Sequence, residues 1–201
     1  SLCIRAMLYL ALLHARANHK KPVIAAGRNA HKVFMTAAAL LDLDIRWIYG
    51  TESVISCAIT PAQLEDVIVS ENPAAVYITS PDYLGNIADI KSLSTVCKKH
   101  GVLLLVDNAH GAYLHFLPEP MHLGADICCD SAHKTLPVLT GGAYLHIAHG
   151  TPDMFAQRAE SAMALFASTS PSYLILQSLD AMNPLLATSF PAQLKACAER
   201  L

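Results

Sequence analysis

The chain has 201 residues, of which 53% are hydrophobic and 15% are charged, and its formal net charge is −2. This length suffices for one domain with a substantial core, and so apolar a composition argues against intrinsic disorder. The small net charge, without a stripe of basic and aromatic side chains, argues against a nucleic-acid partner.

Helices and strands alternate along the chain. Apolar positions from Ile4 to Ala15 recur at helical spacing, and Pro61 stands at the first position of another helix. The expected helices cover 2–18, 30–41, 61–70 and 89–99, with one more opened by Pro152 and a long last one opened by Pro171 and interrupted at Asn183–Pro184. The expected strands cover 21–27, 45–49, 74–80, 102–108, 125–132 and 142–147.

This alternation predicts an α/β fold, a three-layer α/β/α domain with a mostly parallel mixed sheet. Ligands of such sheets sit beyond the carboxyl ends of the strands. The polar residues at those ends are Arg28, 80–82, 107–110 and 131–134. We therefore expect the functional side chains to gather at one edge of the sheet.

The mean hydropathy of +0.36 is high, yet no apolar run approaches the roughly 18 residues that a membrane-spanning helix needs. We attribute the apolar residues to a large buried sheet and expect no membrane partner. No signal peptide is visible at the start. The six cysteines contain no CxxC pair, and adjacent Cys128 and Cys129 would face opposite sides of a strand. They therefore predict buried thiols in a reducing cytoplasm and no metal site.

Asp107 and Lys134 are the residues that carry chemistry. Asp107 ends a buried strand, and Lys134 follows the exit of another. Burial and nearby cations favour the neutral amine of a lysine, which is the nucleophile that forms a Schiff base. A carboxylate can keep the ring nitrogen of pyridoxal phosphate (PLP) protonated. The alternatives are a surface lysine and an aspartate that caps a turn.

Five sequence blocks carry a resemblance to a known family. They are GRNAHKVF (27–34), VYITSPDYLGNIADI (76–90), LLLVDNAHGAYL (103–114), DSAHKTLPVLTGGAYLHI (130–147) and STSPSYLILQSLDAM (168–182). In this order they resemble the major domain of the bacterial ornithine/lysine/arginine decarboxylases, which are PLP enzymes of the aspartate aminotransferase fold type. The resemblance implies a PLP-dependent transferase-like large domain, an amino-acid substrate, and a homodimer with shared active sites.

The resemblance also implies roles for single residues. Lys134 would form the Schiff base, Asp107 would pair with the pyridine nitrogen, and His110 would lie near the reacting carbon. The other cofactor contacts would be Ala109 and His31 on the two ring faces, Ser131 and His133 at the phosphate, and Thr169 and Ser170 at the phosphate of a neighbouring subunit.

Each role has a structural alternative. His31 could cap the following helix, His133 could be a core histidine, and His110 could orient a turn. Thr169 and Ser170 could cap the helix that Pro171 opens.

For the whole chain, the alternatives to a decarboxylase are an aminotransferase or acyltransferase on the same scaffold, and a non-catalytic remnant. We expect residues 1–201 to be a single PLP-binding major domain. It would be a fragment without the family's upstream phosphate loop and C-terminal small domain, and it would bind PLP weakly alone.

Overall fold

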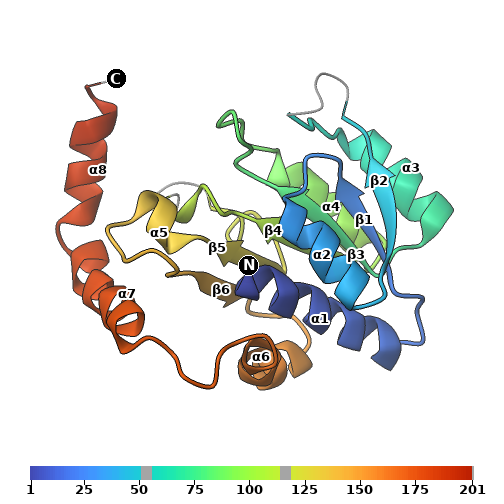
Figure 1. The fold of residues 1–201 in the computed structure, drawn as a ribbon. Helices are drawn as coiled ribbons and strands as arrows, with labels where there is room; N and C mark the ends of the chain where they lie inside the picture. Colours follow the sequence, from blue (N-terminus) through green and yellow to red (C-terminus); the bar gives the residue numbers. More distant parts are fainter. Residues whose placement is uncertain (51–55, 114–118, 201) are drawn as a thin grey trace.

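The computed structural model describes residues 1–50, 56–113 and 119–200. Its centre is a six-stranded sheet in the order β2-β1-β3-β4-β5-β6 (Figure 1). All neighbouring pairs are parallel except β5 and β6, which confirms the mostly parallel mixed sheet. The strands are β1 (Val23–Gly27), β2 (Asp44–Ile48), β3 (Ala75–Thr79), β4 (Leu103–Asp107), β5 (Ile127–Asp130) and β6 (Tyr144–Ile147).

Helices cover both faces of this sheet (Figure 1). The first core lies between the sheet and the helices α1, α2 and α6, and the second lies between the sheet and α3 and α4. The three-layer prediction is therefore confirmed. The helices are α1 (Leu2–Ala17), α2 (Lys32–Leu40), α3 (Pro61–Glu71), α4 (Ile90–Lys99), α5 (Ala132–Thr135), α6 (Met154–Ala164), α7 (Tyr173–Ala187) and α8 (Phe190–Ala198).

The strand residues alternate between these two cores. Tyr77 and Cys129 belong to the first core, and Val76 and Cys128 belong to the second. The two adjacent cysteines thus face opposite sides of β5, as the sequence predicted. All five residues of the central strand β4 are buried, because helices cover it on both sides.

Strand β5 is shorter than the sequence predicted. It ends at Asp130, and Ser131 begins the short helix α5, which carries Lys134. The lysine therefore projects from a helical turn after the strand. The prediction of a strand through residue 132 was wrong, because the chain turns as soon as its pairing with β6 ends at Asp130.

The interruption expected at Asn183–Pro184 was also wrong, because α7 continues to Ala187 with Pro184 inside it. Met182 and the half-buried Leu186 pack on Ala132 and Leu136 around α5. The stabilisation from this packing offsets the cost of the backbone hydrogen bond that the proline cannot donate. Beyond α7, α8 lies at the left-hand edge of Figure 1 and buries none of its residues.

None of the helices formed by the described residues is long and apolar enough to cross a membrane.

Thr60 closes a capping box at the start of α3. Its Oγ1 accepts the backbone N–H of Gln63 at 3.2 Å, and the Gln63 side chain accepts the N–H of Thr60 at 3.0 Å. Thr60→Ala removes the first of these bonds and should lower the free energy of unfolding by about 1 kcal/mol in a urea titration. Thr60→Ser keeps an acceptor and is the control. Equal losses in both variants would contradict a capping role.

Candidate active site

The carboxyl ends of β3 and β4 meet the start of α2 and the helix α5 at one small cavity. Its lining residues are His31, Thr79, Tyr83, Asp107, Ala109, His110 and Lys134. Five of the residues singled out in the sequence therefore lie together. Asp107 and Lys134 are among them, although they come from different elements.

Asp107 is a buried carboxylate that receives hydrogen bonds from three groups. It is 1% exposed. Its Oδ2 accepts the Tyr77 hydroxyl at 2.8 Å, and its Oδ1 accepts the Ala109 N–H at 3.2 Å and the Cys129 thiol at 3.7 Å. These donors replace the water that a buried charge loses.

Lys134 and His110 form a close pair across the cavity. Lys134 Nζ lies 3.1 Å from His110 Nε2. Burial lowers the pKa of His110, and the Lys134 charge lowers it further. A neutral imidazole can accept a proton from the ammonium group. The ring of Tyr83 packs edge-on against His110, with 5.4 Å between the ring centroids.

His31 both caps a helix and lines the cavity. Its Nδ1 accepts the Val33 N–H at 3.1 Å at the start of α2. Burial lowers the pKa of His31, so the ring is mostly neutral at pH 7. The capping alternative is therefore correct, and the same residue also lines the cavity.

Four other residues proposed from the sequence lie outside this cavity lining. Ser131 stands at the start of α5 without a side-chain capping bond, and His133 Nδ1 lies 2.9 Å from the carbonyl oxygen of Gly142. Thr169 and Ser170 are exposed between α6 and α7. The capping alternative for these two was wrong, because Ser172 caps α7 by accepting the Ile175 N–H at 3.5 Å.

Three residues of the site escaped the sequence analysis: Tyr77, Thr79 and Tyr83. Thr79 pairs with Asp107 across the β3–β4 ladder. Its hydroxyl is buried and has no hydrogen-bond partner among the described residues. The signal that could have found Tyr77 and Thr79 is the strand pairing, since both lie on the sheet face that carries Asp107.

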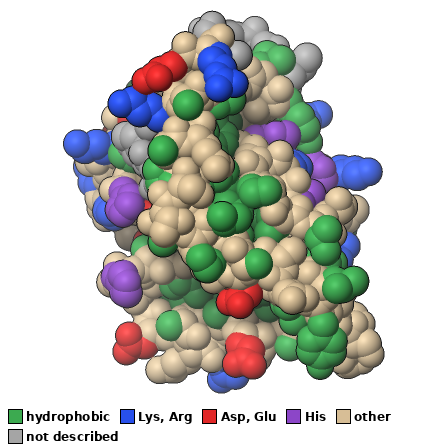
Figure 2. All heavy atoms as spheres, turned by 90° about the vertical axis from the view of Figure 1, so that its left-hand side faces the viewer, with side chains coloured by type: hydrophobic (Ala, Val, Ile, Leu, Met, Phe, Trp, Pro, Cys, Tyr) green, Lys and Arg blue, Asp and Glu red, His purple; other side chains and the backbone are tan. Residues whose placement is uncertain are grey.

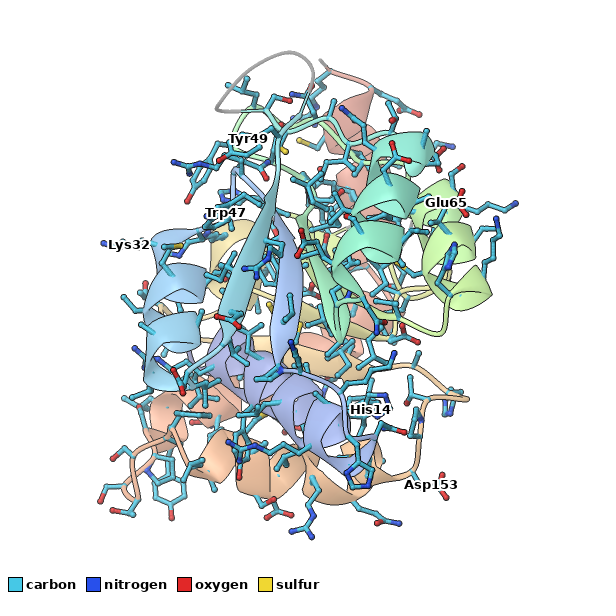
Figure 3. The ribbon with its side chains drawn as sticks, turned by 90° about the vertical axis from the view of Figure 1, so that its right-hand side faces the viewer. His14, Lys32, Trp47, Tyr49, Glu65 and Asp153 are labelled. Atoms are coloured by element: carbon cyan, nitrogen blue, oxygen red, sulfur yellow. The ribbon has the colours of Figure 1, made fainter. Side chains whose placement is uncertain are left out.

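The remaining polar residues at the strand ends have structural roles. Ser80 Oγ accepts the Ala88 N–H at 3.0 Å, and Asp82 accepts the N–H groups of Leu84 and Asn86. Arg28 lies over the ring of Trp47 on β2, with 5.3 Å between its guanidinium carbon and the ring centroid. Figure 3 shows Trp47 on that edge strand.

A partly buried acid, Asp130, supports the same edge of the sheet. Asp130 accepts the Asn108 side-chain N–H at 2.7 Å and lies 2.9 Å from His146 Nε2. Burial lowers the pKa of His146, but its hydrogen bond to Asp130 and the charge of that carboxylate outweigh burial, and the net shift is upward. The network ties the ends of β4, β5 and β6 together.

The sequence profile of the family described as "Orn/Lys/Arg decarboxylase, major domain" matches residues 10–195. The chain belongs to this family. The resemblance seen in the five sequence blocks is therefore confirmed. Among the described residues, no group of three or more His, Cys, Asp and Glu side chains could hold a metal ion.

Several of the similar proteins are named arginine decarboxylase. The protein of that name from Bacillus subtilis is 35% identical over 170 residues, which are 80% of this chain and 34% of the relative. The one from Halalkalibacterium halodurans is 33% identical over 81% of this chain and 34% of the relative. The chain thus spans about a third of the length of these relatives.

Solved structures share the fold. The apo form of mouse CSAD aligns with a TM-score of 0.66 over 91% of this chain and 46% of that chain, at 20% identity. Oryza sativa TDC with PLP aligns with a TM-score of 0.62 over 79% of this chain and 36% of that chain, at 18% identity. These likenesses establish the aspartate aminotransferase fold for the family domain described above.

The His146–Asp130 pair predicts a pH-dependent stability. Because folding raises the pKa of His146, the ion pair contributes its full stabilisation at a pH below the pKa of the unfolded state, about 6.5. This contribution is lost as the pH rises through the pKa of the folded state. His146→Gln keeps a neutral donor but cannot be protonated. In urea titrations the wild type should exceed this variant in stability at pH 5.5, and the difference should shrink by pH 8.5.

The control for this experiment is His149→Gln, which changes an exposed histidine. A stability difference between wild type and His146→Gln that stays constant over this pH range would contradict the ion pair.

Proposed function

We propose that this chain binds PLP and carries the Schiff-base lysine of a decarboxylase that acts on a basic amino acid of the ornithine, lysine or arginine type. The observation that carries the proposal is that Asp107 and Lys134 line the same cavity. The family of the chain and the names of its relatives support it.

The chemistry of the lining residues fits this cofactor. Asp107 is buried, and the cationic nitrogen of a protonated pyridine ring would supply the opposite charge that a buried carboxylate needs. The buried Thr79 hydroxyl lacks a partner among the described residues, and a polar substituent of the ring would provide one. Ala109 is small enough to let a flat ring approach the backbone closely.

When bound, PLP supplies an electron sink for the electrons left behind by the departing carboxylate. The residues around it would hold it and move protons. Asp107 would keep the ring nitrogen protonated, and Lys134 would hold the cofactor covalently through Nζ. His110, 3.1 Å from that nitrogen, would accept the lysine proton and so make the amine nucleophilic. His31 would cover one face of the ring.

Other parts of the proposal extend beyond the cavity. Ser131 and His133 would contact the phosphate, and Thr169 and Ser170 would reach the phosphate site of a second copy in a cytoplasmic homodimer.

Figure 2 shows hydrophobic side chains on the face of the molecule that carries α7 and α8. Exposed apolar residues of this region include Leu165, Tyr173, Leu174, Leu176 and Leu185. Such a surface favours contact with another protein chain.

The reaction can be tested with the full-length protein, PLP, and arginine, lysine or ornithine. We expect release of carbon dioxide and the corresponding amine with at least one of the three. Lys134→Ala should lose this activity to background, because no amine would remain to hold the cofactor. Lys91→Ala, at an exposed position on α4, should retain it.

The products distinguish the alternatives. A keto acid without carbon dioxide would indicate an aminotransferase. No turnover of any of the three amino acids, together with no difference between the wild type and Lys134→Ala in PLP binding, would indicate a non-catalytic protein.

A further inference from the structure

Tyr77 is the largest fully buried side chain of the core, and its hydroxyl donates to Asp107 Oδ2 at 2.8 Å. It lies on β3 two residues before Thr79, which pairs with Asp107 on β4. Side chains two residues apart on a strand share a face of the sheet. The tyrosine can therefore reach along that face to the carboxylate.

The ring of Tyr77 is held in place by its neighbours. It stacks at a tilt on Phe34 of α2, with 4.3 Å between the ring centroids. Tyr77 is 0% exposed, so its ring has no room to turn away. The position of the hydroxyl is thus set by the core of the domain.

This hydroxyl is the closest of the three donors to Asp107. It binds one carboxylate oxygen, while the Ala109 N–H and the Cys129 thiol bind the other. A thiol is a weak donor, so the tyrosine is the main side-chain donor. Burial and the charge of Asp107 raise the pKa of Tyr77 well above its usual range, and the hydroxyl therefore keeps its proton.

We propose that Tyr77 is a positioning residue that acts through Asp107: it fixes the orientation of this carboxylate and stabilises its charged form for the ring nitrogen of PLP. The inference rests on the proposed function, because it assigns Asp107 to the cofactor. From the sequence alone, Tyr77 is an ordinary core residue, because it lies in the middle of an apolar strand. The inference gives it a role in the site.

The test compares PLP dissociation constants of the full-length protein, measured by titrating the absorbance of the bound cofactor. Tyr77→Phe removes one oxygen atom and leaves the ring against Phe34. It should weaken binding roughly tenfold or more, as expected for a lost hydrogen bond to a charged group. The lowest pH at which PLP still binds should rise, because the carboxylate loses a donor that favours its charged form.

Two further variants separate this effect from simple packing. Tyr144→Phe is the matched control, because its hydroxyl donates to the Leu179 carbonyl oxygen at 3.4 Å and not to Asp107. It should bind PLP as the wild type does. In an Asp107→Ala background, Tyr77→Phe should have no further effect, because the acceptor is gone.

The outcomes distinguish this inference from the proposed function. Wild-type affinity in Asp107→Ala would overturn both. If Asp107→Ala binds PLP weakly but Tyr77→Phe binds it with near wild-type affinity, the inference alone is overturned. The same holds if Tyr77→Phe lowers the PLP affinity equally in the wild type and in the Asp107→Ala background. If Asp107→Ala binds too weakly to measure, an unchanged pH dependence in Tyr77→Phe would overturn the inference.

Discussion

The in-register pairing of β3, β4 and β5 is the constraint on which the site depends. It places Thr79 beside Asp107 and Asp107 beside Cys129. Because strand side chains alternate between faces, a slip of one residue would turn Asp107 toward the opposite core. Tyr77 on β3 and Cys129 on β5 both donate to Asp107 in the observed register. These cross-strand hydrogen bonds favour the register that points the buried carboxylate toward the cavity.

Two acids, the buried Asp107 and the partly buried Asp130, organise the edge of the sheet where a ligand would bind. Asp107 is held from β3 and β5 by Tyr77 and Cys129, and Asp130 is held by Asn108 and by His146 on β6. Each acid takes its donors from neighbouring strands, so the ends of the strands are linked by hydrogen bonds as well as by the backbone ladder. Such a rigid edge suits a site that must hold a flat ring in one orientation.

The sequence predicted the layers of the fold and the grouping of Asp107, His110 and Lys134, because strand–helix alternation and the strand-end rule are local signals. His31 was proposed only through the family resemblance. The sequence did not predict Tyr77 and Thr79 as site residues. Their contribution depends on which strand lies next to β4 and in which register, and a linear pattern does not contain that information. The helix α5 and the continuity of α7 through Pro184 were missed for a similar reason, since both depend on packing between distant segments.

The central claim is that Asp107 and Lys134 hold one PLP molecule between them. Its most direct test is to incubate the full-length protein with PLP, reduce it with borohydride and map the modified lysine by mass spectrometry. The account predicts one reduced cofactor per chain, attached to Lys134, and much less label when Asp107 is replaced by Ala. Label spread over surface lysines, or none on Lys134, would contradict it.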